Sequence, residues 1–179
     1  MTLLPLPIFL FGAVVGSFLN VCIVRIPRGD SIVHPPSHCP ECDIAIQFYD
    51  NVPLISYLVL LGRCRSCGKR ISARYFFVEL LMASLAVALY LEFGFSLAFL
   101  VSFVFVAALI VISFIDLDVR IVPDVISLPG IAAGLLFSVV ARYAINDPFE
   151  IIPSPLSALI GVLVGGGFLL ALAWAYEAY

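Results

Sequence analysis

The sequence predicts an all-α, multi-pass membrane protein with about five transmembrane helices and one small cysteine-rich insert. Of its 179 residues, 63% are hydrophobic and only 12% are charged. Soluble domains average about 45–50% apolar and about 25% charged residues, so this chain has too few polar side chains to cover a soluble globule of its size. Lipid must therefore contact much of its surface.

Five apolar segments approach the ~20 residues that are needed to cross the hydrocarbon core of a bilayer. They are residues 4–24, 75–91, 95–115, 125–141 and 155–176. We expect each to be helical, because lipid offers backbone N–H and C=O groups no partner outside the segment. The fourth segment is short and contains Pro129. The first is interpreted as a retained anchor and not as a signal peptide, because Arg25 and Arg28 follow its apolar run and no basic residue precedes it.

The basic residues predict which side of the membrane each loop faces. Seven of the nine lie between the first two spans, namely Arg25, Arg28, Arg63, Arg65, Lys69, Arg70 and Arg74. By the positive-inside rule, this segment is cytosolic and the N-terminus faces outward. Arg120 agrees with this orientation and Arg142 opposes it. The chain thus divides into a first transmembrane helix (residues 1–25), a cytosolic insert (residues 26–73) and the remaining transmembrane helices (residues 74–179).

Two CxxC motifs in the insert are typical of a zinc site. They supply Cys39, Cys42, Cys64 and Cys67, with 21 residues between the motifs. Each CxxC turn can present two thiolates to one tetrahedral ion, and an insert of this size has too few residues to form much of a core unaided. Two disulfides are a less favoured alternative, because the cytosol is reducing. A redox CxxC would not account for the second motif.

The other cysteine, the histidines and the basic residues of this region receive structural interpretations. Cys22 lies inside the first span and acts as a small apolar residue. His34 and His38 are near enough to substitute as ligands, but four cysteines already complete the coordination shell. The basic residues around the second CxxC motif are interpreted as topogenic charges beside lipid headgroups, in preference to a nucleic-acid patch. We therefore expect no nucleic-acid partner.

Three carboxylates cluster where the third span meets the fourth, at Asp116, Asp118 and Asp124. Asp116 directly follows a long apolar run, and ionisable groups at membrane depth are costly and usually functional. A structural interpretation, in which charges mark helix ends, fits Asp116 equally well. It is favoured for Asp118 and for Asp124, which can cap the fourth helix.

Polar and small residues within the first two spans are expected to join helices. Glu79 is interpreted as one half of a buried ion pair with Arg74 or Arg120. Asn20 is expected to hydrogen-bond between helices, and the motif Gly12-x-x-x-Gly16 is expected to let two helices approach closely.

Taken in order, several motifs resemble one family of bacterial enzymes. They are Gly16-Ser17-Phe18-Leu19-Asn20-Val21, Arg25-Ile26-Pro27, the two CxxC motifs with Asp50-Asn51-Val52-Pro53-Leu54 between them, Ile71-Ser72-x-Arg74-Tyr75, Val78-Glu79, Ile115-Asp116 and Pro123-Asp124. This series, from about Phe11 to Gly130, resembles the type IV prepilin peptidases, also called leader peptidase/N-methyltransferases, of pilus and type II secretion systems. Phe76 stands where the family often has proline, which is a minor departure.

The resemblance implies a membrane aspartyl endopeptidase of the bacterial inner membrane. Members of the family cut the leader from prepilins or pseudopilins on the cytosolic side, after a glycine, and many then methylate the new N-terminus with S-adenosylmethionine. By match to the motif, Asp116 would be the first catalytic aspartate, and the four cysteines would bind zinc. No residue is assigned to S-adenosylmethionine, because the chain has no glycine-rich strand–turn–helix signature.

One motif that the resemblance implies is missing. The family's second catalytic aspartate lies in a Gly-x-Gly-Asp motif after the next helix, and the 179 residues hold no such motif. We therefore expect a truncated or incomplete chain that is inactive in proteolysis by itself. Two other functions stay open: a non-enzymatic membrane adaptor whose zinc-binding domain docks a partner, and a small transporter that uses Asp116 and Glu79 in a polar pathway.

Overall fold

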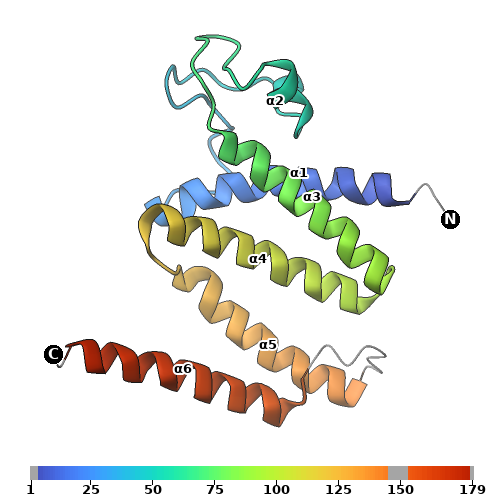
Figure 1. The fold of residues 1–179 in the computed structure, drawn as a ribbon, viewed down its shortest axis with the longest axis vertical. Coiled ribbons are helices and arrows are strands. Elements are labelled where there is room, and N and C mark those ends of the chain that lie inside the picture. Colours follow the sequence, from blue (N-terminus) through green and yellow to red (C-terminus); the bar gives the residue numbers. More distant parts are fainter. Residues whose placement is uncertain (1–3, 145–152, 178–179) are drawn as a thin grey trace. The chain divides into compact units, whose positions relative to one another are not determined.

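The structure, a computed structural model, describes residues 4–144 and 153–177. The chain divides into two compact units, Met1–Pro123 and Asp124–Tyr179. All regular elements of the described residues are helices (Figure 1). The predicted all-α class is therefore confirmed.

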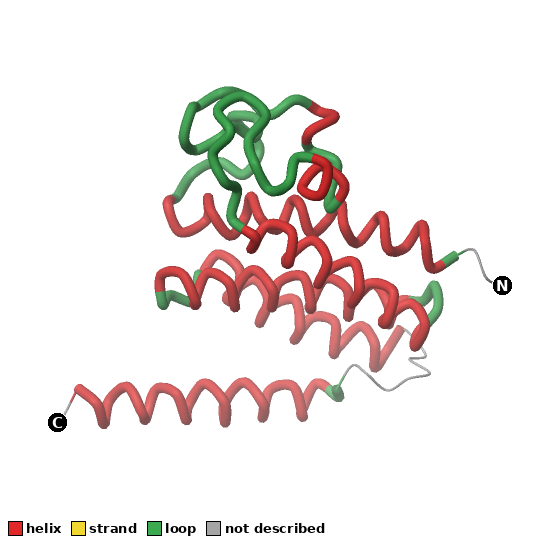
Figure 2. The backbone as a smooth tube through the Cα atoms, turned by 45° about the horizontal axis from the view of Figure 1, so that its top comes forward, coloured by secondary structure: helices red, strands yellow, loops and turns green. Residues whose placement is uncertain are grey.

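The first unit contains three long helices, α1 (Pro5–Arg25), α3 (Ala73–Phe93) and α4 (Leu97–Val119). Pro5 opens α1, where its missing N–H leaves no donor unpaired. Serine side chains cap the other two: the Ser72 hydroxyl accepts from the backbone N–H of Arg74, and the Ser96 hydroxyl accepts from that of Phe99. Both α1 and α3 contact α4, and the three helices form one bundle (Figures 1 and 2).

Helices α1 and α3 pack closely through the predicted glycine motif. A Cβ atom added at Gly12 would lie 2.7 Å from the Cβ of Ala86, and one added at Gly16 would lie 2.7 Å from the Cα of Glu79. Contacts this short leave no room for a side chain on α1 at either position. The predicted close approach is confirmed.

The insert between α1 and α3 is mostly loop (Figure 2). It contains two short 3₁₀ helices, η1 (Ile26–Arg28) and η2 (Phe48–Asp50), and one short α-helix, α2 (Ile55–Val59). Most of its large apolar side chains are exposed; that of Phe48, for example, is 84% exposed. The insert therefore has almost no apolar core of its own.

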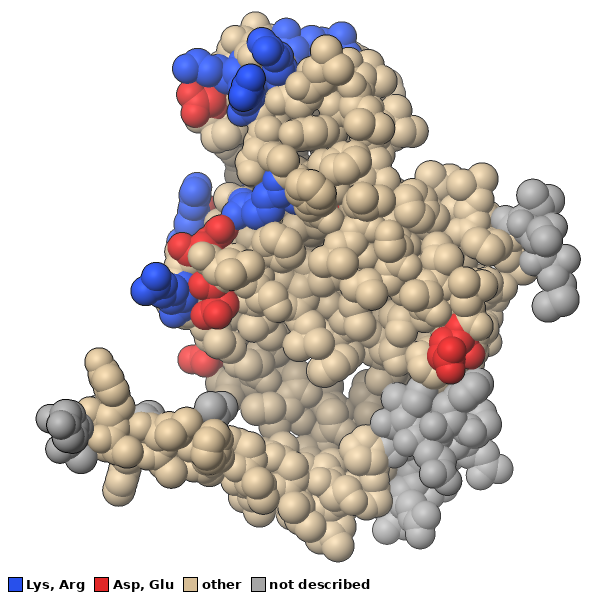
Figure 3. Space-filling model, in the orientation of Figure 1, with Lys and Arg blue, Asp and Glu red and all other residues tan. Residues whose placement is uncertain are grey.

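Four helical segments of the described residues are long and apolar enough to cross a membrane. They are Pro5–Arg28, Ala73–Phe93, Leu97–Val119 and Pro155–Tyr176. The predicted fourth span falls in α5 (Asp124–Ala144), whose apolar segment, Asp124–Val140, is shorter. In the first unit, most charged side chains lie on the insert and at one end of the helices (Figure 3). The chain is a multi-pass membrane protein.

The second unit consists of α5 and α6 (Pro155–Glu177), which contact each other. Pro129 lies inside α5, as the sequence requires if this span is helical. Large apolar side chains of α6 are exposed, as expected of a helix that faces lipid. The predicted outer loop, residues 142–154, and the side chain of Arg142 fall largely outside the described residues.

Candidate metal centre and neighbouring site

The first CxxC motif forms a tight turn closed by backbone hydrogen bonds. The N–H of Cys39 donates to the carbonyl of Ile44 at 3.0 Å, and the N–H of Asp43 donates to the carbonyl of Cys39 at 2.8 Å. Asp43 adopts a left-handed conformation with φ of 58°, which aspartate tolerates better than most residues. The turn brings both sulfur atoms to the same side.

The second CxxC motif repeats this turn. The N–H of Cys64 donates to the carbonyl of Lys69 at 2.8 Å, and that of Gly68 donates to the carbonyl of Cys64 at 2.9 Å. Gly68 has a φ of 70° and occupies the position of Asp43 in the first turn. The prediction of a tight turn at Gly68 is confirmed.

The two turns bring the four predicted cysteines together. The sulfur atoms of Cys39, Cys42, Cys64 and Cys67 lie within 4.8 Å of one another, and those of Cys39 and Cys67 are 3.9 Å apart. Tetrahedral coordination at a Zn–S distance of about 2.3 Å places sulfur atoms about 3.8 Å apart. All four thiols are free. The cluster therefore fits a metal ion, and zinc in particular.

The histidines and the remaining cysteine stand apart from this cluster. Cys22 is buried in α1, as predicted for a small apolar residue. The ring of His38 lies 3.7 Å from the carboxylate of Asp43, with its Nδ1 atom 3.2 Å from the carbonyl oxygen of Pro36. Neither His34 nor His38 belongs to the group of candidate ligands found among the described residues.

The electrostatics of the cluster favour a bound cation. Hydrogen bonds from the backbone N–H groups of Cys67 and Ser66 lower the pKa of the Cys64 thiol to about 7. For Cys42, the backbone N–H of Ile44 lowers the pKa, but burial and the three neighbouring thiols outweigh it and raise the pKa to about 12. Four adjacent thiols therefore cannot all ionise alone, whereas a divalent ion would stabilise all four thiolates.

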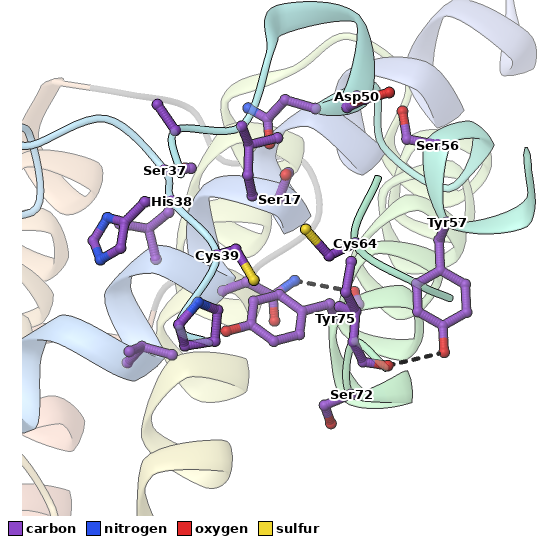
Figure 4. A pocket seen from close by; sticks show the side chains of 18 of the residues that line it. Ser17, Ser37, His38, Cys39, Asp50, Ser56, Tyr57, Cys64, Ser72 and Tyr75 are labelled. Atoms are coloured by element: carbon purple, nitrogen blue, oxygen red, sulfur yellow. Dashed lines mark hydrogen bonds between the residues drawn. The ribbon is translucent and has the colours of Figure 1, made fainter. Parts of the chain in front are cut away.

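A cavity of about 1110 Å³ lies between the insert and the α1–α3 pair. Side chains from both parts line it: Ser17 and Tyr75 from the helices, and Cys39 and Cys64 from the insert (Figure 4). Asn20 and Glu79 also line it. The metal centre thus forms part of the wall of a pocket whose floor is the helix pair.

Glu79 does not form the predicted ion pair. Its Oε2 atom accepts a hydrogen bond from the backbone N–H of Leu54 at 2.8 Å, so it ties the insert to α3. Arg74 instead pairs with Asp118 at the end of α4. The prediction of an ion pair with Arg74 or Arg120 is wrong, because the tight turn before α2 brings a backbone donor to Glu79, which sequence spacing alone does not reveal.

Asp116 lies in the last turn of α4, in the first unit. Its side chain is exposed and forms no hydrogen bond or ion pair with the described residues. The last turn of α1, the first turn of α3 and the last turn of α4 lie on the same side of the bundle. Asp116, in the last turn of α4, therefore lies on the side that carries the insert. The ion pair of Arg74 with Asp118 joins α3 and α4 at that end. Asp124 is the first residue of α5 and belongs to the second unit.

One interaction in the insert was not foreseen. The Arg65 guanidinium donates two-point hydrogen bonds to the Asp50 carboxylate, with the shortest contacts at 2.7 Å, and lies 5.7 Å from the centre of the Tyr49 ring. These hydrogen bonds hold the pKa of Asp50 below its ordinary value. Asp50 is the first residue of one of the motifs that resemble the peptidase family. No other feature of the sequence points to this residue.

Two family models match most of the chain. Residues 10–93 match the bacterial peptidase A24 N-terminal domain, and residues 103–178 match the type IV leader peptidase family. The first match contains the insert and both CxxC motifs, and the second contains Asp116.

Curated relatives with one shared name match the chain as well. The prepilin leader peptidase/N-methyltransferase of Myxococcus xanthus (strain DK1622) is 45% identical over 128 residues, which are 72% of this chain and 38% of that protein. The protein of the same name from Aeromonas hydrophila is 34% identical over 95% of this chain and 64% of its own length. That from Dichelobacter nodosus is 32% identical over 97% of this chain and 68% of its own length.

The first two of these relatives are longer than the region they share with this chain, which spans less than two thirds of each. No solved structure matches the chain.

Proposed function

The chain belongs to the type IV leader peptidase family, and we propose that it contributes to a membrane aspartic endopeptidase that cuts leader peptides from type IV prepilins or pseudopilins. The observation that carries this proposal is the position of Asp116, an exposed carboxylate in the last turn of an apolar helix, at the end of the bundle that carries the insert. A substrate with an apolar stem in lipid could present its leader there.

The chemistry requires a second carboxylate. One carboxylate takes a proton from water while the water oxygen attacks the scissile carbonyl carbon, and the other, protonated, carboxyl donates its proton to the carbonyl oxygen. The carbon–nitrogen bond then breaks, and the leaving amine takes up a proton. We assign Asp116 to one of these roles. The Gly-x-Gly-Asp motif expected to supply the other is not present in the 179 residues, so this chain by itself is proposed to be inactive in proteolysis.

We place the reaction on the cytosolic side of the bacterial inner membrane. The cluster of basic residues in the insert supports this orientation, with the N-terminus outside, by the positive-inside rule. The cytosol is also reducing, which keeps the four cysteines available as metal ligands. Their basic neighbours then face lipid headgroups, and no nucleic acid is required.

The four-cysteine cluster is proposed to hold a structural zinc ion through Cys39, Cys42, Cys64 and Cys67. Bound zinc would stabilise the four thiolates and fix the two CxxC turns to each other. N-methylation of the new N-terminus with S-adenosylmethionine is a second proposed activity, and it rests on the family and on the names of the relatives.

The proposal is tested by Asp116→Asn in the complete enzyme, with cleavage of a prepilin followed on a gel. Because the amide can neither accept a proton from water nor supply one as a carboxylic acid does, we expect cleavage to fall by at least about a hundredfold. Asp118→Asn is the matched control. It removes only a partly exposed ion pair, so most activity should remain.

Full cleavage by the Asp116→Asn enzyme would refute the catalytic role of Asp116, whereas no cleavage by the wild-type complete protein would favour the non-enzymatic adaptor function, in which the insert docks a partner. The 179-residue chain alone should give no cleavage in the same assay. Turnover by that chain would show that its own residues complete the catalytic pair.

A further inference from the structure

The floor of the cavity beneath the insert holds polar groups that the peptidase chemistry does not use. Asn20 on α1 is only 2% exposed, and Glu79 on α3 is only 8% exposed. Both line the cavity. Their backbones are close, because Gly16, one turn before Asn20, packs against the Cα of Glu79.

Asn20 has an unsatisfied acceptor. Its Nδ2 atom lies 3.0 Å from the carbonyl oxygen of Tyr75 and 3.4 Å from that of Gly16, and it donates to both. These two acceptors fix the orientation of the amide, because the opposite orientation would turn the side-chain oxygen of Asn20 toward the carbonyl oxygens of Tyr75 and Gly16. The Oδ1 atom is buried and has no hydrogen-bond partner among the described residues. Buried polar atoms are rarely left unpaired, so a donor that the described residues do not supply, from water or from a ligand, is expected here.

Glu79 adds negative charge to the same floor. Its carboxylate accepts a hydrogen bond from the backbone N–H of Leu54 at 2.8 Å. No arginine, lysine or histidine forms an ion pair with it within the described ranges, since Arg74 pairs with Asp118. A buried carboxylate without a counter-charge favours a cationic ligand.

We propose that this floor binds a primary ammonium group, which donates hydrogen bonds to Asn20 Oδ1 and to the Glu79 carboxylate. Three N–H donors and one positive charge match an unpaired acceptor beside a carboxylate. The cavity, at about 1110 Å³, is large enough for a drug-sized ligand or several residues of peptide.

Two ligands of the proposed enzyme carry such a group, and the inference rests on that proposed function. One is the N-terminus that leader cleavage creates, and the other is the amino-acid end of S-adenosylmethionine. N-methylation requires both of these ligands. In each of them the nitrogen is an ammonium group bonded to an α-carbon. Arg74 has a buried, unpaired Nε–H on the same cavity, which could pair with the adjoining carboxylate of the second ligand.

The test measures binding to the zinc-loaded 179-residue chain in detergent by titration calorimetry, with paired probes. S-adenosylmethionine is compared with 5′-methylthioadenosine, which lacks the amino-acid end. A short peptide with a free N-terminus is compared with its acetylated form. We expect at least one amine-bearing probe to bind about tenfold or more tightly than its amine-free counterpart, because hydrogen bonds to charged groups are among the strongest. The pair that shows this preference identifies the source of the ammonium.

Glu79→Gln should remove the preference, because the amide keeps an acceptor for Leu54 but loses the charge. Glu92→Gln is the matched control: it removes one exposed carboxylate from the other end of α3 and should leave the preference intact. A purely structural role for Glu79 would weaken both members of each pair equally.

Equal binding within both pairs, or no binding of either amine, would overturn the inference. The wild-type comparison decides this even if Glu79→Gln does not fold. Because the assay involves neither cleavage nor Asp116, its failure would leave the proposed peptidase function untouched.

Discussion

The insert and the α1–α3 pair differ in what holds each of them together. Helix α3 presents Val78, Met82, Ala83 and Ala86 to the bundle with none of their surface exposed. Across residues 26–72 of the insert, the only buried residues are Cys39, Ser56 and Gly62. Two adjacent parts of one unit therefore rely on different interactions, side-chain packing in one and a sulfur cluster in the other.

This difference implies that the two parts fail independently. Close packing between helices persists in lipid without any ion, because it depends on shape and on small residues. The insert buries too little apolar surface to offset the conformational entropy of ordering its loops, so it depends on the metal. Its ties to the helices do not replace the metal: they include the hydrogen bond of Leu54 with Glu79, those of Arg25 with the carbonyls of Ser31 and Pro35, and the ring contact of Tyr57 with Phe76.

The largest effect is expected from loss of the metal. Cys64→Ser, or a strong chelator, should unfold residues 26–72 while α1, α3 and α4 stay helical, because metal binding supplies most of the folding free energy of such small domains. Zinc content should fall from about one ion per chain to near zero. Hydrogen exchange followed by mass spectrometry should show loss of protection confined to the insert.

Cys22→Ala is the matched control, since Cys22 is buried in α1 and lies outside the cluster. It should leave both the zinc content and the protection of the insert unchanged. Loss of protection in α3 together with the insert would contradict the independence of the two parts.

The fold and the metal centre could largely be predicted from the sequence because each depends on local patterns. Long apolar runs and the two CxxC turns encode their structures within a few residues, and the apolar run that precedes Asp116 predicts its position at a helix end. The partner of Glu79 could not be predicted in this way. It is a backbone N–H of Leu54, brought there by a left-handed residue with φ of 62°. Nor does the sequence reveal the unpaired Oδ1 of Asn20, which depends on the carbonyl of Tyr75 in another helix.

An intermediate effect is expected from Gly16→Ala in the helix pair. The added Cβ would lie 2.7 Å from the Cα of Glu79, so the helices must separate, and overpacking of this kind costs about 1–3 kcal/mol. The thermal midpoint of the helical signal in detergent should fall, while the zinc content stays the same. Gly161→Ala is the control, because among the described residues the added Cβ would have no neighbour within 4 Å beyond the adjoining residues and the backbone of its own helix. A loss of zinc in Gly16→Ala would show that the insert depends on the helix pair more than on its metal.

The smallest effect is expected from the Asp50–Arg65 pair, which joins η2 to the second CxxC turn. Asp50→Asn removes a two-point ion pair whose carboxylate is only 9% exposed but whose arginine is 54% exposed, so water screens the pair in part. The thermal midpoint of the zinc-loaded insert should fall by roughly a few degrees. Arg65→Lys should give a similar fall, because lysine keeps the charge but cannot donate two parallel hydrogen bonds.

The pH dependence of this small effect separates the ion pair from the metal. Because Arg65 lowers the pKa of Asp50, the pair stabilises the folded insert fully above the ordinary aspartate pKa of about 3.9, and that stability is lost only as the pH falls through the lower folded pKa. Protons compete with zinc for the thiolates at higher pH than this. Between about pH 8 and about pH 5, wild type and Asp50→Asn should therefore lose stability in parallel, with a constant difference in midpoint. A difference that shrinks over this range would mean that Asp50 titrates there, and that Arg65 does not hold its carboxylate in the way the structure indicates.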